Sequence, residues 1–234
     1  MSLSKLTIVI PTFYPGKIIK KCLASLPLTS EIIIIDNGED LELEKIIKLQ
    51  KHKIKHYKVG DVGLSKSFNI ALAKSKNENI LITQPDVCFE KNSIINLVKA
   101  QKKYTKAGII SPLLFEKNKY SQYDYLDLSL SKLGTLENKR RAEKVSIFPS
   151  GDICVEAVNA TAMLIKKSII KKINGWDENI YTYHEDIDLC LRLRKKGYPI
   201  MKIKNSIAHH VGFGSNKKKN KEKIDKSRNW HFCW

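Results

Sequence analysis

The sequence predicts one α/β domain in which helices flank a mostly parallel, doubly wound central sheet. Two observations lead to this fold class. Short apolar runs alternate with amphipathic stretches through the first half of the 234-residue chain, and each run ends in turn-forming or polar residues. Continuous apolar runs of this kind are typical of strands buried on both faces of a parallel sheet. A chain of this length in which 42% of residues are hydrophobic favours one core rather than two.

The first half of the chain is expected to contain three strands and three helices. The expected strands, each followed by a turn, are Leu6–Ile10, Ile32–Ile35 and Ile80–Thr83. The expected helices between them are Lys17–Leu26, Leu41–Lys53 and Leu64–Ser75. In the last of these, Leu64, Phe68, Ala71 and Leu72 follow the helical spacing i, i+4, i+7, i+8.

The second half begins with an irregular excursion from Phe115 to Ser150, after which regular elements return. We expect a strand over Val158–Ile165, a short helix over Lys166–Ile173 and a helix over Glu185–Lys196. The last helix has acidic residues in its first turn, basic residues in its last turn and Gly197 behind it, as helix-dipole and C-cap preferences require.

Charge and composition narrow the function classes. With 42 Lys+Arg against 24 Asp+Glu the formal charge is +18, which favours acidic partners such as nucleotide diphosphates, anionic lipid headgroups or nucleic acid. No apolar run approaches the roughly 20 residues that span a bilayer, and Pro11 comes too early for a signal peptide, so a cytoplasmic location is expected. Five cysteines without a C-x-x-C pair fit neither a disulfide framework nor a zinc site, and most are expected to be buried.

Asp36 and Asp86 follow two of the expected strands and are therefore candidates for ligand contacts. In open α/β sheets ligands bind beyond the carboxyl ends of the strands. Asp36 is placed to accept hydrogen bonds from a ribose or base, and Asp86 is a candidate oxygen ligand for a hard divalent cation. The alternative for each is a turn-forming Asp that bonds its own backbone.

An acidic cluster and a histidine pair are the other candidates. Three acidic residues lie within four positions at the start of the last helix: Glu185, Asp186 and Asp188. This number exceeds what helix capping and the helix dipole explain. His209 and His210 precede a glycine-containing segment expected to lie outside regular structure, where an imidazole is able to bind a metal. A surface histidine pair without a role is the alternative.

Taken together, these segments resemble the inverting family 2 glycosyltransferases, and within them the bacterial rhamnosyltransferase-like branch. The resemblance runs from Thr7 to about Ser215. Its motifs occur in the family's order: Ile8-Val9-Ile10-Pro11-Thr12, Ile35-Asp36-Asn37-Gly38, Gly63 with Asn69, Gln84-Pro85-Asp86-Val87, Ala162-Met163-Leu164, Gly175-Trp176-Asp177-Glu178 and His184-Glu185-Asp186-Ile187-Asp188-Leu189-Cys190.

The resemblance implies a GT-A fold, Rossmann-like, in a single domain, and assigns roles to residues. Asp186 is implied as the general base with Glu185 beside it, and Asp86 and His210 as ligands of Mg²⁺ or Mn²⁺. Donor-side residues are implied to be Pro11, Thr12, Asp36, Asn37, Gly63, Asn69 and Asp86; acceptor-side residues are implied to be Trp176, Asp177 and Asp188. Asp61 departs from the family pattern, in which an Asn is common before this Gly63.

The implied function is inverting transfer of a sugar from a dTDP- or UDP-sugar, dTDP-rhamnose being the expected donor, to a lipid-linked or cell-surface glycan. Two other classes stay open: a catalytically inactive nucleotide-sugar-binding protein of the same fold, and a basic nucleic-acid-binding module. No nucleic-acid motif is present, so nucleic acid is not expected as a partner.

The expected organisation is a glycosyltransferase domain over residues 1–215 followed by a basic and aromatic tail. Residues 1–110 are the nucleotide-sugar half and residues 111–215 the acceptor and catalytic half. The tail, residues 216–234, combines a lysine run with Trp230, Phe232 and Trp234. Basic residues beside aromatic ones suit an anionic surface, so we expect a peripheral contact with the inner face of the cytoplasmic membrane.

Overall fold

The computed structural model describes residues 3–117, 123–125, 128–130, 136–138 and 150–211. Its strands are β1 Leu6–Thr12, β2 Glu31–Asp36, β3 Lys53–Lys58, β4 Asn79–Thr83, β5 Val87–Phe89, β6 Ile109–Lys117, β7 Tyr123–Tyr125, β8 Leu128–Leu130, β9 Leu136–Asn138, β10 Ile153–Val155, β11 Ala162–Lys166 and β12 Ile200–His210. Its helices are α1 Ile19–Ser25, α2 Leu41–Lys48, α3 Leu64–Lys74, α4 Ser93–Lys103, α5 Lys167–Lys172 and α6 Glu185–Lys195, with 3₁₀ turns at Leu3–Lys5 and Gly16–Ile18.

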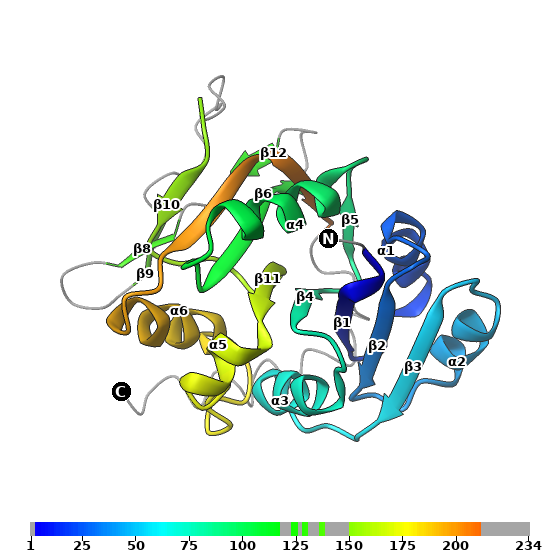
Figure 1. Ribbon diagram of the computed structural model, residues 1–234. Coiled ribbons are helices and arrows are strands. Elements are labelled where there is room, and N and C mark those ends of the chain that lie inside the picture. The colour runs from blue at the N-terminus through cyan, green and yellow to red at the C-terminus, as the bar shows by residue number, and fades with distance from the viewer. Residues whose placement is uncertain (1–2, 118–122, 126–127, 131–135, 139–149, 212–234) are drawn as a thin grey trace.

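The elements form a mixed α/β domain around one curled sheet (Figure 1). In the described residues the strand order is β10-β12-β6-β11-β4-β1-β2-β3, with β5 added to β12 and β7 to β6. β1, β2 and β4 run parallel, as their apolar runs predict, and β3 runs parallel to β2. β11 runs antiparallel between β4 and β6, so the second half of the sheet is mixed.

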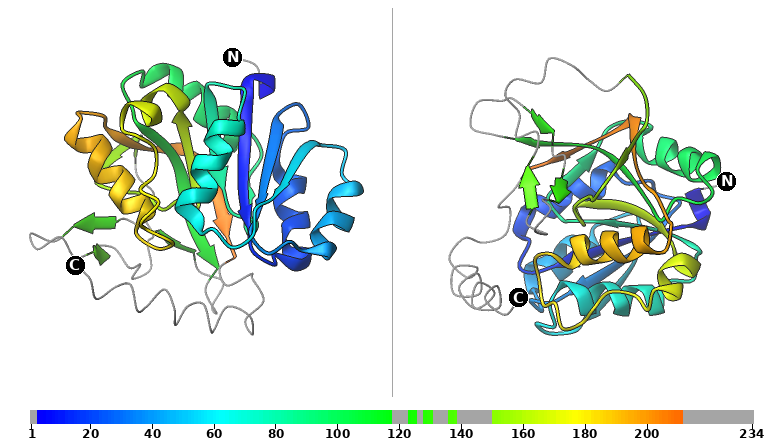
Figure 2. Two further views of the ribbon diagram at one scale, coloured as in Figure 1. Left: turned by 90° about the horizontal axis from the view of Figure 1, so that it is seen from below. Right: turned by 90° about the vertical axis from the view of Figure 1, so that its left-hand side faces the viewer.

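Helices cover both faces of the sheet (Figures 1 and 2). Alternate side chains of a strand point to opposite faces. Accordingly Ile32 and Ile34 of β2 belong to the core cluster that includes residues of α1, α2 and α4, whereas Ile33 and Ile35 belong to the cluster that includes residues of α3, α5 and α6. The run of four isoleucines therefore serves two cores, and burying each side chain contributes about 1.5–3 kcal/mol.

Two expected boundaries are wrong and one strand was not expected, each for a physical reason. The helix expected over 41–53 ends at Lys48, and Lys53–Lys58 forms β3. Among the described residues β3 pairs with β2 alone and is therefore an edge strand. Edge strands often carry lysines, so β3 has no continuous apolar run that would predict it. The strand expected from Val158 starts at Ala162; Val158 and Ala160 are buried, but in a loop.

The other differences lie between residues 109 and 210. β6 extends to Lys117, and β7, β8 and β9 lie within the expected excursion. His210, expected outside regular structure, is the last residue of the eleven-residue strand β12. Of the cysteines described, Cys22 and Cys190 are buried, whereas Cys88 is half-buried and Cys154 exposed.

No helix among the described residues has the length and apolar character that a membrane span requires. The tail over residues 216–234, including Trp230, Phe232 and Trp234, lies outside the described residues, as does Gly212.

Candidate active site

The candidate residues from both halves of the chain lie along one edge of the sheet. Thr12 and Asp36 are paired in register at the carboxyl ends of β1 and β2. Ala162, the first residue of the antiparallel β11, is paired with Thr83, the last residue of β4. The start of β11 therefore lies beside the strand ends where ligands bind in open α/β sheets.

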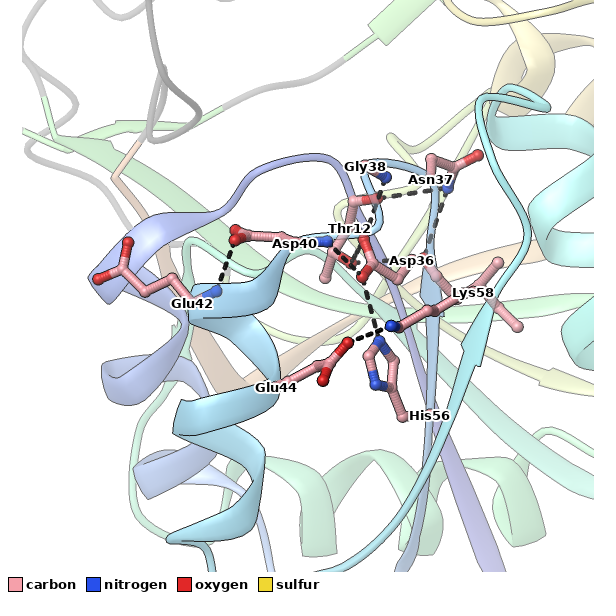
Figure 3. Close-up of polar contacts among 10 residues, drawn as sticks. Thr12, Asp36, Asn37, Gly38, Asp40, Glu42, Glu44, His56 and Lys58 are labelled. Carbon is pink, nitrogen blue, oxygen red and sulfur yellow. Dashed lines mark hydrogen bonds and ion pairs between the residues drawn. The ribbon is translucent and has the colours of Figure 1, made fainter.

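Asp36 is fully buried, and each of its carboxylate oxygens has two donors (Figure 3). Oδ1 accepts from the Gly38 N–H at 3.0 Å and from the Thr12 hydroxyl at 3.4 Å. Oδ2 accepts from the Asp40 N–H at 3.0 Å and lies 3.1 Å from His56 Nε2. A carboxylate has about four acceptor positions, so this one is saturated within the protein. These contacts match the turn-forming alternative of the sequence analysis.

Asn37 ties the end of β2 to the loop before α3. Its Nδ2 lies 2.9 Å from the Ser67 hydroxyl, and its Oδ1 accepts from the Val62 N–H at 3.2 Å. Pro11 is buried within β1, opposite Ile35. Gly63 precedes α3 with φ +80°, a left-handed conformation that favours glycine.

Asp86 and His210 lie together, although 124 residues separate them in the sequence. The His210 Nε2 lies 3.3 Å from Asp86 Oδ2, and the Val211 N–H donates to the Asp86 carbonyl at 3.0 Å. β12 and β5 impose this proximity, because His210 is paired with Val87, the residue after Asp86.

The pair fits a hard divalent cation. Asp86 is 8% exposed, and its Oδ1 is buried without a hydrogen-bond partner in the described part of the chain. Neighbouring ligands of an octahedral Mg²⁺ with bonds of about 2.1 Å are roughly 3 Å apart, close to the separation of the two side chains. Within the described residues no group of three or more His, Cys, Asp or Glu side chains is arranged to hold a metal ion. A cation here would take its other ligands from substrate phosphates and water, as Mg²⁺ commonly does.

Asp186 is held at the start of α6 by two backbone donors. Oδ2 accepts from the Ala160 N–H at 3.0 Å, and Oδ1 accepts from the Ile187 N–H at 2.8 Å. Thr161, the next residue after Ala160, accepts a hydrogen bond through its carbonyl from the Thr83 hydroxyl at 3.1 Å. This chain of contacts places Asp186 at the edge that carries Asp86. Burial raises the pKa of Asp186, and the two N–H donors oppose that rise.

Glu185 is a second acid of this cluster with a raised pKa. It is 3% exposed, and its Oε2 has no hydrogen-bond partner among the described residues. Burial and the charge of Asp186 raise the pKa of Glu185 to about 8. The first turn of α6 therefore holds two carboxyl groups that burial disfavours in the charged form.

Three side chains expected to face ligands hold the protein together instead. Asn69 donates through Nδ2 to the Trp176 carbonyl and to Glu178 Oε1, both at 2.9 Å, and accepts from the Trp176 N–H at 3.0 Å. Trp176 is 2% exposed and packs on Phe68 with ring centroids 5.1 Å apart, so its ring belongs to the core and not to an acceptor surface.

Asp188 likewise makes an internal contact. It pairs with Arg192 at 2.6 Å, and Arg192 also donates to the carbonyls of Ile173 and Gly175, both at 2.7 Å. This link anchors the turn after α5 to α6. Asp177, in contrast, is exposed, and its Oδ1 accepts from the N–H and the side chain of Asn179.

Sequence reasoning missed His56, Ala160 and Tyr181 as parts of the site. His56 lies on the missed strand β3, and Ala160 acts through its backbone, which leaves no signal in its side chain. Tyr181 contacts the loop before α3, and a signal was present, because the unusual Asp61 is its partner.

Comparison with known proteins finds a matching family and named relatives. The family model described as Glycosyl transferase family 2 matches residues 7–162. The rhamnosyltransferase WbbL of Escherichia coli K12 is 29% identical over 91% of this chain and 84% of its own length. The N-acetylglucosaminyl-diphospho-decaprenol L-rhamnosyltransferase of Mycobacterium tuberculosis is 22% identical over 88% of this chain and 78% of its own length.

A solved structure shares the fold. The crystal structure of GalNAc-T7 with UDP, GalNAc and Mn²⁺ superposes with a TM-score of 0.72 at 14% identity, over 90% of this chain. This chain spans 45% of that one. The likeness confirms the expected GT-A fold.

Proposed function

We propose that this chain, which belongs to glycosyl transferase family 2, transfers a sugar with inversion and uses Asp186 as the general base. As a member of that family it is a glycosyltransferase that uses a nucleotide-sugar donor. The observation that carries this proposal is the hydrogen bond from the Ala160 N–H to Asp186 Oδ2 at 3.0 Å. It holds a half-buried carboxylate beside the strand ends, where a donor would lie.

The proposed reaction is a single displacement. Asp186 takes the proton of an acceptor hydroxyl while the hydroxyl oxygen attacks the anomeric carbon on the face opposite the diphosphate. The bond between that carbon and the diphosphate oxygen breaks, and the nucleoside diphosphate leaves with the bonding electrons. Burial raises the pKa of Asp186, which makes its carboxylate a stronger proton acceptor. The N–H donors of Ala160 and Ile187 fix its orientation. The exposed Asp177, on the segment before α6, is proposed to contact the acceptor.

We assign Asp86 and His210 to a bound Mg²⁺ or Mn²⁺. The cation would neutralise charge on the donor diphosphate, and the presence of both UDP and Mn²⁺ in the GalNAc-T7 structure supports this role. The fit rests on the separation of 3.3 Å between the two side chains and on Asp86 Oδ1, which has no hydrogen-bond partner among the described residues.

We propose that the donor nucleoside lies over the ends of β1 and β2, at Pro11, Thr12 and the Asp36-Asn37 turn. The saturated Asp36 would act by holding the backbone of Gly38 and Asp40 in place. The two named rhamnosyltransferases support dTDP-rhamnose as donor, with other dTDP- or UDP-sugars as the next candidates. The decaprenol-linked substrate in the name of the mycobacterial relative supports a lipid-linked glycan acceptor.

The division into a donor half, residues 1–110, and an acceptor half, residues 111–215, is part of the proposal. So is a cytoplasmic location at the inner face of the membrane, with the tail over residues 216–234 as the contact. Liposome sedimentation tests the contact: binding should need anionic lipid and should be lost when residues 216–234 are deleted. Binding that ignores lipid charge or survives the deletion contradicts it.

A panel of nucleotide sugars tests the function. Hydrolysis and thermal shift should be measured with and without Mn²⁺, and the anomeric configuration of any transfer product determined. We expect dTDP- or UDP-sugars to stabilise the protein in a metal-dependent way and the product to be inverted. Binding without turnover across donors and lipid-linked acceptors would favour the inactive binding protein instead.

A further inference from the structure

Tyr181 links the segment that precedes α6 to the loop that precedes α3. Its carbonyl accepts from the Leu64 N–H at 2.7 Å. Its hydroxyl donates to Asp61 Oδ1. A Cβ added at Gly63 would lie 2.5 Å from the Tyr181 carbonyl oxygen and 2.6 Å from its ring, so the glycine is required for this close approach.

The same loop is fastened on its other side to the end of β2. The Val62 N–H donates to Asn37 Oδ1 at 3.2 Å, and the Val59 N–H donates to the Asp36 carbonyl at 3.1 Å. Asp36 and Asn37 are the turn over which the donor nucleoside is proposed to lie. The loop over residues 59–63 therefore spans from the donor side of the sheet to Tyr181.

Between Tyr181 and α6 the backbone adopts a restricted conformation. Tyr183 and His184 both have left-handed conformations, with φ of 64° and 69°, and Glu185 begins α6 directly after them. Non-glycine residues persist in this region only when the surroundings impose it. Tyr181 lies five residues before Asp186, so its position affects where the first turn of α6 begins.

We propose that Tyr181 is a positioning residue that couples donor binding at the Asp36-Asn37 turn to the placement of Asp186 at the acceptor side. The inference rests on the proposed function and deepens it. The hydroxyl bond to Asp61 and the packing on Gly63 hold the segment over residues 176–184 against the donor-side loop. A donor that orders this loop thereby orders the general base.

The chemistry of the contact accounts for Asp61. Burial and the neighbouring Asp61 carboxylate raise the pKa of the Tyr181 hydroxyl, which therefore stays protonated and donates. An amide oxygen at position 61 accepts the same bond, whereas a methyl group does not. Asp61→Asn should therefore preserve the coupling, and Asp61→Ala should break it.

Four variants test the proposal in the full chain. Tyr181→Phe and Asp61→Ala remove the bond, and Asp61→Asn keeps an acceptor for it. Tyr104→Phe is the matched control, because its hydroxyl donates to Asp152 at 2.8 Å between α4 and the start of β10, away from this edge of the sheet. It removes a bond of the same type and reports the purely structural cost.

Two readouts separate positioning from stability. In steady-state transfer, Tyr181→Phe and Asp61→Ala should lower kcat by about tenfold or more with the donor KM nearly unchanged, since misplacing a reacting group by 1 Å costs up to about 10² in rate. Asp61→Asn and Tyr104→Phe should keep kcat within about threefold of the parent, because both leave the contact that positions the base intact.

Hydrogen exchange gives the second readout and needs no turnover. Adding UDP or dTDP with Mn²⁺ should slow exchange in peptides that cover residues 181–187 of the parent protein and of Asp61→Asn. In Tyr181→Phe that slowing should be lost, while peptides covering residues 36–40 stay protected. Equal protection of residues 181–187 in Tyr181→Phe and the parent, or no nucleotide effect there in the parent, overturns the coupling. Failure of the proposed function is a different result, the absence of transfer by the parent.

Discussion

Replacing Asp186 by Asn is the sharpest test of the proposed mechanism, because the two side chains have the same size but only Asp accepts a proton at neutral pH. In the structure the carboxylate accepts one N–H from Ala160 and one from Ile187. The Asn oxygen is able to keep one of these bonds, while its NH₂ group would face the other donor. The replacement also removes the repulsion between Asp186 and the buried Glu185.

The substitution should lower the catalytic rate far more than it lowers the stability of the protein. A positioned general base contributes about 10² to 10⁴ in rate, which is about 3 to 5 kcal/mol in the barrier. Loss of one hydrogen bond to a charged acceptor costs about 1.5 to 3 kcal/mol of stability, before the relief at Glu185. For a chain of this size 1 kcal/mol shifts Tm by about 2 to 4 °C, so the variant should remain folded at assay temperature.

The assay is transfer turnover measured beside donor affinity and Tm. We expect turnover of Asp186→Asn to fall at least about 100-fold while donor affinity changes little, since the base acts on the acceptor. Asp188→Asn is the matched control: it removes an acid from the same helix turn, but one that pairs with Arg192. Its turnover should stay within a few-fold of the parent. Near-normal turnover in Asp186→Asn refutes the assignment of the base.

Three further predictions follow from the same edge of the sheet. Asp86→Ala and His210→Ala should each lower metal-dependent donor binding, by isothermal titration with and without Mn²⁺; turnover unaffected by EDTA would contradict the metal assignment. Since the pKa of Glu185 is raised from 4.5 to about 8, the folded state keeps a proton that the unfolded state loses, so stability should fall as pH rises across that interval. Urea denaturation should show a flatter pH dependence in Glu185→Gln, and an unchanged slope would contradict the raised pKa. Asp36→Asn should lower the free energy of unfolding, measured by urea denaturation, by about 2 to 5 kcal/mol, because at least one of the four donors loses its acceptor and the amide adds donors of its own. An unchanged unfolding midpoint with weaker nucleotide binding would refute the structural role.

The central strands were predictable because burial on both faces leaves a continuous apolar signal. β1, β2 and β4 extend the expected strands by only a residue or two. β3 and β12 carry no such signal. β3 is an edge strand with alternating lysines, and β12 contains exposed polar residues near its irregularity between Ile203 and Ile207. Edge position and irregular pairing are tertiary properties, which a local pattern does not record.

The pairing of Asp86 with His210 was predictable only through the resemblance, because the sequence around either residue does not indicate that the other lies beside it. Register explains it after the fact, since His210 opposes Val87 across β12 and β5. The same limit applies to the internal contacts of Asn69, Trp176 and Asp188, which no local pattern indicates. These residue types suit ligand binding and internal fastening equally well, and only their contacts decide between the two.

The carboxylate of Asp36 is saturated within the protein, so at the proposed donor site Asp36 would act without offering an atom to the ligand. Its carboxylate meets Gly38, Asp40, Thr12 and His56, which come from two neighbouring strands and the turn after β2. A nucleoside that took one of these four acceptor positions would leave a buried donor unpaired, at a cost of about 1 to 3 kcal/mol. Recognition at this turn is therefore better served by the backbone groups that Asp36 arranges than by Asp36 itself. The same reasoning applies at Tyr181 and Ala160, so the precision of this site resides largely in its supporting contacts.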